Sequence, residues 1–248
     1  MKQVLSILFL LLLSLSAYSV TKAEADTLYS NENYQKAAKA YEAILSEQGV
    51  AAEIYYNLGN CYYKMENIPL AILNYERALM LSPGDGDIRA NLALARGKTI
   101  DKVTPPYEMF FVTWWRDFTH YQSLSAWATT GIVCFILTLV ALLFYFLAFG
   151  IRLRKVSFYL GIVCLGLTVL VNLAAYSLSS EMERNKAAIV MQAAVSVKSS
   201  PSESSTDLFL IHEGSKVKLI DCTMKDWYEV KLEEGKQGWL PAAAVEII

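Results

Sequence analysis

Cysteine and histidine are the residues of this 248-residue chain best suited to redox, metal-binding or nucleophilic chemistry. The four cysteines are Cys61, Cys134, Cys164 and Cys222. No two of them stand at the C-x-x-C spacing of a thiol-disulfide or zinc site. His120 and His212 lie far apart in the sequence, and no set of nucleophile, base or metal ligands accompanies either one. The sequence therefore predicts no catalytic residue, no metal site and no cofactor. It favours the cysteines as small buried hydrophobic residues, with a contact between Cys134 and Cys164 left open.

Residues 52–85 resemble a tetratricopeptide repeat and read AEIYYNLGNCYYKMENIPLAILNYERALMLSPGD. The residues at repeat-defining positions are Tyr55, Leu58, Gly59, Tyr62, Ala71, Tyr75, Ala78 and Pro83. This spacing is typical of two antiparallel helices packed face to face, in which Gly59 permits close approach and Pro83 ends the second helix. The resemblance implies protein binding, because such repeats rarely carry out chemistry.

One helix pair cannot bury its outer face alone, so a neighbouring repeat is required. The matching residues one repeat earlier are Ala25, Leu28, Tyr34, Ala37, Tyr41 and Ile44. Both repeats place Glu-Asn at the turn between helices, where we expect Asn33 and Asn67 to adopt a left-handed conformation. Residues 87–99 have apolar side chains at helical spacing and predict a capping helix. The expected all-α repeat domain is therefore residues 20–104.

The resemblance also implies which side chains line the concave, partner-binding side of the repeats. They are Lys22, Asp26, Tyr29, Glu53, Tyr56, Asn57, Asn60, Tyr63 and Lys64. Some members of this repeat family bind a terminal carboxylate with a clamp of basic and Asn side chains. Here Asp26 replaces an Asn and Asp87 stands where a Lys would be, and these carboxylates would repel such a ligand. An internal segment with basic or aromatic residues is the better expectation.

Hydrophobic residues make up 54% of the chain, above the roughly 45–50% of an ordinary soluble domain. The excess lies in two uncharged stretches, and each exceeds the roughly 20 residues needed to span a bilayer. They predict transmembrane helices at 123–150 and 156–180. Arg152, Arg154 and Lys155 lie between them, so the positive-inside rule makes 151–155 a cytoplasmic loop.

The first residues, 1–19, have the pattern of a secretory signal peptide: Lys2, then an apolar run, then small residues. Cleavage near Ala17 or near Ala23 is left open, and the earlier position is favoured. A signal peptide followed by two spans predicts a multi-pass protein of the cytoplasmic (inner) membrane. Its repeat domain and C-terminal domain are both expected in the periplasm.

Residues 105–122 are rich in Tyr, Trp and Phe, which favour the head-group level of a membrane. We interpret them as an interfacial segment that leads into the first span, with a ligand-binding aromatic cage as the alternative. His120 belongs to this segment and is interpreted as a polar residue facing the head groups.

After the second span the apolar residues alternate, and Gly, Ser and Pro mark turns, which predicts short antiparallel strands. Ile189, Met191, Ala193, Val195 and Val197 are expected on one face. Residues 187–248 resemble a bacterial SH3 domain, through VSVKSSPS, EGSKVKLID, DWYEVKL and the closing GKQGWLPAAAVEII. The resemblance implies a small all-β barrel and a peptide or cell-wall ligand. Its candidate contact residues are Lys198, Trp227, Tyr228 and Trp239, although the favoured interpretation of the three aromatic ones is that they close the barrel. The family usually has Arg and Gly where this chain has Lys198 and Ser200.

The complete order of segments resembles the BatE proteins of the Bacteroides aerotolerance operon. This implies a membrane-bound member of an assembly with von Willebrand A-domain proteins and a MoxR-type ATPase. The sequence therefore favours a non-catalytic scaffold that binds protein partners. A peptidoglycan-binding anchor and a thiol-dependent redox component are the alternatives. Both soluble parts carry a small excess of acidic residues, so we expect no nucleic acid partner.

Overall fold

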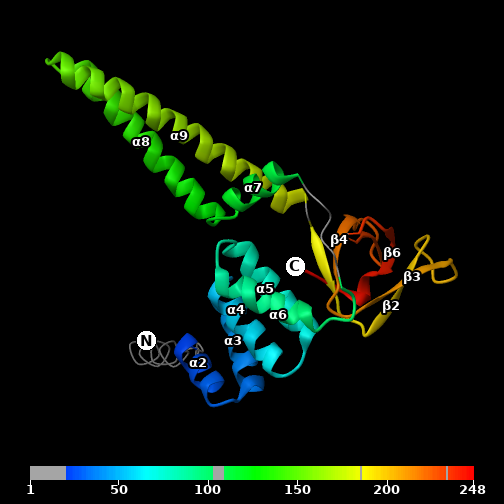
Figure 1. Cartoon of the computed structure of the whole chain (residues 1–248). Coiled ribbons are helices and arrows are strands. Elements are labelled where there is room, and N and C mark those ends of the chain that lie inside the picture. Colours follow the sequence, from blue (N-terminus) through cyan, green and yellow to red (C-terminus); the bar gives the residue numbers. More distant parts are fainter. Residues whose placement is uncertain (1–20, 103–108, 185, 233) are drawn as a thin grey trace, which may run out of the picture.

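The computed structural model describes residues 21–102, 109–184, 186–232 and 234–248. The expected signal peptide, and residues 105–108 of the aromatic segment, lie outside this range. Figure 1 shows a helical repeat region and a β barrel next to each other at one end of a long helical hairpin. The predicted fold class, with all-α repeats, a pair of long apolar helices and a small all-β domain, is confirmed.

The repeat region consists of consecutive antiparallel helices. These are α2 (Lys22–Ser30), α3 (Tyr34–Gln48), α4 (Ala52–Lys64), α5 (Ile68–Leu81) and α6 (Gly86–Gly97). Gly59 of α4 lies against the ring of Tyr75 in α5, so that a Cβ atom at position 59 would come within 2.7 Å of two ring carbons. Tyr75 is buried, as are Ala71 and Ala78 on the same helix. The small residues thus bring the two backbones together as their spacing predicts.

The turns between paired helices differ from the prediction. Glu32 and Glu66, not the asparagines, have positive φ angles of 59° and 58°. Asn33 and Asn67 precede the next helix instead, and Asn67 Oδ1 accepts a hydrogen bond from the Leu70 amide at 3.3 Å. Asn is among the best residues at a helix N-cap, and the left-handed position falls to the residue before it.

The hairpin consists of α8 (Leu124–Leu147) and α9 (Ile151–Arg184), which pack along their length. Both are long and apolar enough to cross a membrane. The chain reverses at 148–150, so residues 151–155 form the first turn of α9 and the expected loop at these positions is wrong. No Gly or Pro stands within 151–155 to stop the helix from starting there.

A short helix, α7 (Phe110–Thr119), leads into the hairpin. Trp115 Nε1 donates to Ser177 Oγ of α9 at 3.2 Å, whereas Trp114 is 71% exposed. Trp127 Nε1 donates to the Thr119 carbonyl oxygen at 2.9 Å. These bonds hold α7 against the foot of the hairpin with part of its aromatic surface free.

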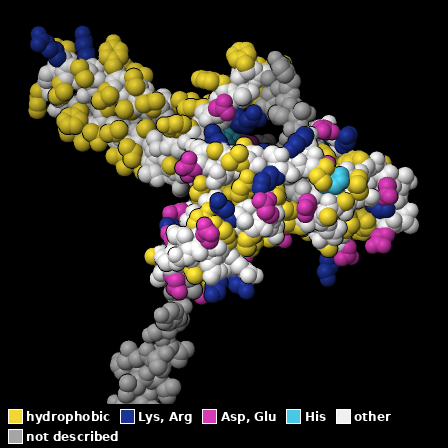
Figure 2. Space-filling model, turned by 60° about the horizontal axis from the view of Figure 1, so that its bottom comes forward, with side chains coloured by type: hydrophobic (Ala, Val, Ile, Leu, Met, Phe, Trp, Pro, Cys, Tyr) yellow, Lys and Arg dark blue, Asp and Glu magenta, His cyan; other side chains and the backbone are white. Residues whose placement is uncertain are grey.

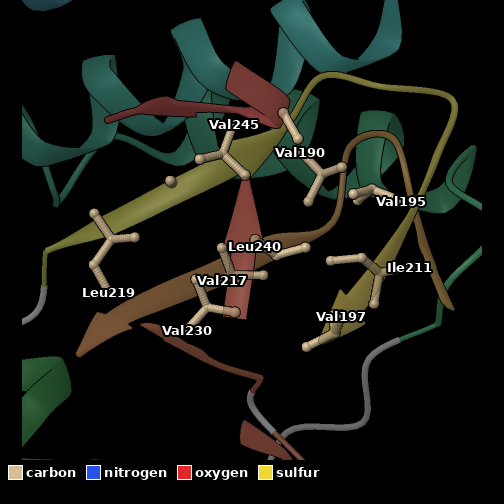
Figure 3. Packing of buried hydrophobic residues seen from close by; sticks show 11 residues of the cluster. Val190, Val195, Val197, Ile211, Val217, Leu219, Val230, Leu240 and Val245 are labelled. Carbon is tan, nitrogen blue, oxygen red and sulfur yellow. The ribbon is translucent and has the colours of Figure 1, made fainter. Parts of the chain in front are cut away.

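The C-terminal domain is a seven-stranded antiparallel sheet in the order β3-β2-β6-β5-β4-β1-β7. Its strands are β1 (Ala187–Val190), β2 (Ala194–Lys198), β3 (Asp207–His212), β4 (Lys216–Asp221), β5 (Trp227–Lys231), β6 (Gln237–Pro241) and β7 (Val245–Ile247). Alternate residues fill one apolar core, including Val197, Val217, Val230 and Leu240 (Figure 3).

The alternation predicted for residues 189–197 is divided between two strands, because β1 ends at Val190. Ala188 and Val190 face the barrel core, whereas Ile189 is fully buried among side chains of α5 and α6. β1 is therefore covered on both faces. The reason is that the barrel packs against the repeat region, a contact that the sequence pattern does not reveal.

Polar contacts complete this interface. Glu76 of α5 is buried, and its carboxylate forms ion pairs with Arg96 of α6 and with Lys216 of β4, the latter at 2.8 Å. Burial disfavours the charged form of Glu76, but the two nearby cations outweigh this and lower its pKa. Buried charges are stable only when paired in this way. The two soluble domains therefore form one packed unit.

Asp101 forms the second polar connection between the domains. Its carboxylate accepts hydrogen bonds from the His212 amide at 2.7 Å and from Ser215 Oγ at 2.7 Å. It also lies 2.9 Å from His212 Nδ1. Burial opposes ionisation of Asp101, but these hydrogen bonds prevail and lower its pKa.

Candidate partner-binding groove

A cavity of about 310 Å³ opens on the side of the repeats formed by α2, α4 and α6. Its lining residues are Tyr29, Tyr56, Asn60, Tyr63, Lys64, Tyr75, Asn91 and Leu94. Tyr29 lies on α2, and Tyr56, Asn60, Tyr63 and Lys64 recur at helical spacing on α4, so these side chains face the same side of the repeats. The structure thus brings together five of the predicted groove residues. We call this cavity the tyrosine groove.

An amide network fixes the floor of the tyrosine groove. Asn60 Oδ1 accepts hydrogen bonds from the Tyr75 hydroxyl at 2.7 Å and from Asn91 Nδ2 at 3.0 Å. Asn91 Nδ2 also donates to the Tyr56 hydroxyl at 2.9 Å. The rings of Tyr56 and Tyr75 lie with their centroids 6.0 Å apart. The aromatic side chains are therefore held in place before any partner arrives.

Asn91 was not among the predicted groove residues, because sequence reasoning gave α6 only a capping role. The available signal was its position on the helix. Asn91 lies beside the buried stripe of Ile88, Leu92 and Ala95, so it must face the neighbouring repeat. A polar residue at such a position requires a hydrogen-bonding partner, and here it has two.

At one edge of the groove a lysine of the chain itself lies over a tyrosine ring. Lys98 Nζ lies 4.4 Å from the centroid of the Tyr63 ring, a cation–π contact. The same ammonium forms an ion pair with Glu66 at 2.8 Å. The hydrogen bond to Glu66 raises the pKa of Lys98. A cation over the face of a half-buried tyrosine is therefore compatible with this site.

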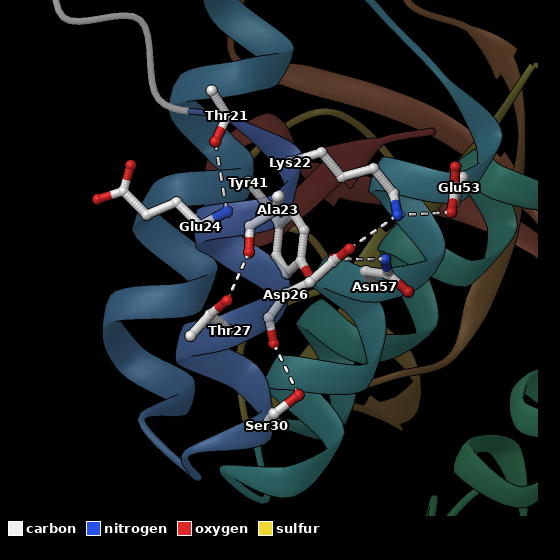
Figure 4. Close-up of polar contacts among 10 residues, drawn as sticks. All are labelled: Thr21, Lys22, Ala23, Glu24, Asp26, Thr27, Ser30, Tyr41, Glu53 and Asn57. Atoms are coloured by element: carbon white, nitrogen blue, oxygen red, sulfur yellow. Dashed lines mark hydrogen bonds and ion pairs between the residues drawn. The ribbon is translucent and has the colours of Figure 1, made fainter.

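The remaining predicted residues form a separate polar cluster next to the groove (Figure 4). Lys22 Nζ lies 2.8 Å from Asp26 Oδ2 and 2.8 Å from Glu53 Oε1. Asp26 Oδ1 accepts from the Tyr41 hydroxyl at 2.6 Å and from Asn57 Nδ2 at 3.5 Å. With two carboxylate partners, Lys22 is already neutralised. A chain-terminal carboxylate would have to displace one of them.

The charges in this cluster stabilise each other. The hydrogen bond to Asp26 raises the pKa of Lys22. Burial alone would raise the pKa of Asp26, but hydrogen bonds from Lys22 and Tyr41 outweigh it and lower the pKa. Both groups are therefore charged at neutral pH, and the acidic excess of the cluster lies beside the groove.

The cysteine and histidine side chains are placed as follows. All four cysteines are free, and the expectation that they are buried is wrong for Cys222, which is exposed. Cys61 is buried inside the repeats, and burial raises the pKa of its thiol to about 12. His120 Nε2 lies 3.7 Å from a Glu181 oxygen. Across the described ranges, no group of three His, Cys, Asp or Glu side chains could hold a metal ion.

The candidate contact residues of the barrel divide between its two faces. The register sets Lys198 opposite Trp239, and Trp239 opposite Glu229, so these side chains share the outer face with Trp227. Tyr228 packs against the core instead. Lys198 Nζ is bound to Asp207 at 2.6 Å and to the Glu203 carbonyl oxygen at 3.0 Å. It therefore stabilises its own loop.

Comparison with known families agrees with both soluble domains. Residues 52–85 match the tetratricopeptide repeat family, and residues 193–246 match the bacterial SH3 domain family. No curated protein shows significant similarity to the chain. Both matched families are non-catalytic, and the repeat match implies protein partners. The chain thus joins a tetratricopeptide repeat region and a bacterial SH3 domain to a hairpin of two long apolar helices.

Proposed function

We propose that this protein is a non-catalytic, membrane-anchored scaffold that binds a segment of a partner protein in the tyrosine groove. The observation that carries the proposal is the pre-ordered aromatic surface: Tyr56 and Tyr63 are half-buried, and Asn91 fixes Tyr56 from a third helix. Rigid aromatic side chains in a concave site are the usual anchors of a protein interface.

The chemistry of the groove favours an internal segment with basic or aromatic residues. Asp26 and Glu53 lie beside it, and Tyr63 already accepts a cation on its face. Because Lys98 occupies one face of Tyr63, a Lys or Arg of the partner would gain cation–π contacts with Tyr29 or Tyr56 and ionic contacts with the acidic cluster. A terminal carboxylate would meet the acidic cluster and lose free energy.

The anchor is the α8–α9 hairpin, whose apolar side chains point outward. Phe146 is 70% exposed and Leu147 is 63% exposed. A continuous apolar surface of this extent is unfavourable in water and suited to lipid. The hairpin returns the chain to its starting side, so the repeats and the barrel lie on one side of the membrane. The basic residues at the far turn make that far side cytoplasmic and the soluble side periplasmic.

The partners that we propose follow from the resemblance to the BatE proteins. They are von Willebrand A-domain membrane proteins of the same operon, in an assembly concerned with oxygen tolerance. The groove supports protein binding in general, and the choice of these partners rests on the order of segments alone.

Site-specific photo-crosslinking in intact cells tests the proposal. A benzophenone side chain replaces Leu94, which is 61% exposed and lines the groove, and in a control replaces Val50, which is 64% exposed and lies outside it. We expect a discrete crosslinked partner from position 94 only. Tyr56→Ala and Tyr63→Ala should weaken its capture by about 1–3 kcal/mol. Equal products from both positions, or no effect of the tyrosine substitutions, would falsify the groove assignment.

Anchoring to peptidoglycan is the second candidate, because Trp227 and Trp239 are partly exposed on the outer face of the barrel. The loop lysine, Lys198, is occupied by Asp207 and offers little to a wall polymer. We therefore expect the detergent-solubilised chain to stay in the supernatant when it is centrifuged with purified peptidoglycan. Sedimentation that resists high salt would favour the wall anchor over the scaffold.

A thiol-dependent role predicts loss of function when Cys61 and Cys222 are replaced by Ser. The scaffold predicts no such loss. The buried, protonated thiol of Cys61 favours the scaffold.

A further inference from the structure

A larger cavity, of about 970 Å³, lies where α3, α4 and α5 meet the barrel. Tyr55, Leu58 and Tyr62 line it from α4, on a different face of that helix from the one that lines the tyrosine groove. Met191 and Glu213 line it from the barrel. Both soluble domains therefore contribute to this cavity, which we call the junction groove.

The charged lining of the junction groove is mostly acidic. It consists of Glu42, Glu66, Glu213 and Glu246, with Arg77. Arg77 is already engaged, by Glu246 at 3.3 Å and by the Ile247 carbonyl oxygen at 2.6 Å. Glu66 is paired with Lys98 at 2.8 Å, outside the groove lining. The charges of Glu66 and Glu246 are therefore balanced, and those of the other two glutamates remain.

Glu42 and Glu213 have no cationic partner among the residues that the structure describes. Glu42 accepts a hydrogen bond from the Tyr62 hydroxyl, which is a neutral donor. Glu213 is exposed, and its carboxylate forms no hydrogen bond or ion pair within the described ranges. The first belongs to α3 and the second to the turn between β3 and β4. Two carboxylates from different domains suit an extended ligand with separate positive charges better than a single small ion.

Helix α5 supplies a buried hydrogen-bond acceptor to the same groove. Asn74 lines the groove although it is only 3% exposed. Its Nδ2 donates to the Leu70 carbonyl oxygen of its own helix at 2.8 Å. Its Oδ1 accepts no hydrogen bond from the described residues. A buried acceptor without a donor is unfavourable, so this oxygen is suited to an N–H group of a ligand.

The rest of the lining indicates that the ligand comes from water. Apolar side chains such as Leu70 and Met191 are half-buried in the groove, and none of its lining residues belongs to α7, α8 or α9. Figure 2 shows charged side chains over the soluble domains and at the far tip of the hairpin, with a largely hydrophobic hairpin surface between them. The groove is thus a mixed apolar and acidic surface of the soluble domains, which is typical of a protein-binding site.

We propose that the junction groove binds an extended segment of a partner protein in which basic residues flank an apolar one. One basic side chain pairs with Glu42 and another with Glu213. A backbone N–H of the segment donates to Asn74 Oδ1, and the apolar side chain packs on Leu70 and Met191. An acidic segment is repelled by the same carboxylates. The site is separate from the tyrosine groove, so the protein can hold two segments at once.

Fluorescence anisotropy with the full chain in neutral detergent tests the proposal. The probe is a short labelled peptide in which Lys alternates with Thr and Val, and a second peptide has Glu in place of every Lys. Glu42→Gln and Glu213→Gln each remove one unpaired charge. Glu47→Gln and Glu203→Gln are the matched controls, because both residues are exposed and neither lines the groove. Asn74→Leu removes the acceptor at similar volume, and circular dichroism checks that each variant is folded.

We expect the Lys peptide to bind the parent and the two control variants equally. Each groove glutamate variant should bind it about threefold more weakly, and the double variant about tenfold, since distant sites act additively. Asn74→Leu should be as stable as the parent and bind about threefold more weakly. The Glu peptide should bind to none of them.

Equal binding of the Lys peptide by the parent and the double glutamate variant would overturn the proposal, as would no binding to the parent. A third contrary result would be weaker binding by Tyr56→Ala that the glutamate variants do not share. That result would place the peptide in the tyrosine groove instead.

Discussion

Gly59→Ala tests whether close packing between α4 and α5 maintains the tyrosine groove. Two effects of the substitution oppose each other. Alanine favours a helix interior over glycine by about 1 kcal/mol. The added methyl group, however, would lie 2.7 Å from both Cδ1 and Cε1 of Tyr75, closer than carbon atoms approach in real structures.

The steric effect should prevail because the Tyr75 ring has little freedom to move. Its side chain is fully buried, and its hydroxyl is bound to Asn60 at 2.7 Å. Overfilling a packed core usually costs about 1–3 kcal/mol. After subtracting the gain in helix propensity, we expect a net loss of about 1–2 kcal/mol in the free energy of unfolding. Displacement of Tyr75 would also disturb the amide network beneath the groove.

Gly97→Ala is the matched control. Gly97 is the last residue of α6, and no atom lies within 4 Å of the position of its missing Cβ. This variant should be unchanged or more stable by up to about 1 kcal/mol. Urea unfolding of the full chain in detergent, followed by circular dichroism at 222 nm, measures both, since the hairpin stays helical in the micelle. If Gly59→Ala proves as stable as Gly97→Ala, the packing argument is wrong.

The remaining predictions concern the interface, the turns and the orientation in the membrane. Glu76→Gln should lower the free energy of unfolding by about 1–3 kcal/mol at pH 7, because it removes the charge that Arg96 and Lys216 share. The lowered pKa of Glu76 means that its contribution is complete above the ordinary value near 4.5 and is lost as the pH falls below it. Stability measured between pH 6 and pH 3 should therefore decline less in the variant, and parallel curves would count against the pairing. Glu32→Gly should stabilise the protein by about 0.5–1 kcal/mol in urea unfolding, because glycine tolerates the positive φ angle at this turn; a destabilised variant would contradict this. An alkaline phosphatase fused after Ile248 should be active and one inserted at Arg152 inactive, and the reverse pattern would invalidate the proposed orientation.

The repeat fold and much of the groove follow from local sequence, because both depend on spacing within one helix pair. Gly59 and Tyr75 pack as their repeat positions predict. Tyr56, Tyr63 and Asn60 come together for the same reason, since residues at matching repeat positions face one side. Asn91 was not predicted as a groove residue, because its hydrogen bonds depend on α6 packing against α4, which is a contact between neighbouring units.

The contact between the two soluble domains could not be predicted in this way. The segment that joins the repeats to the barrel runs through the whole hairpin, so no short-range pattern records the contact. In the sequence, Glu76 looks like any other polar residue of a repeat helix. Only the structure shows that Lys216 of the barrel forms an ion pair with it. Ile189 stands between Ala188 and Val190, and this apolar run does not tell which domain each side chain faces. In the structure Ala188 and Val190 face the barrel core, whereas Ile189 is buried among side chains of α5 and α6.

This contact makes α5 a structural element of both soluble domains. One side of α5 supplies Tyr75, which supports the groove through Asn60. Another side supplies Ile72, which belongs to the same buried cluster as Ile189, and Glu76, which binds Lys216. A shift of the barrel would therefore move the helix on which the floor of the groove depends. The packed cores on both sides of α5 resist continuous deformation, so they favour discrete arrangements. The barrel thus has a role that needs no ligand of its own: it holds the repeats in a fixed orientation at the foot of the hairpin, and the groove with them.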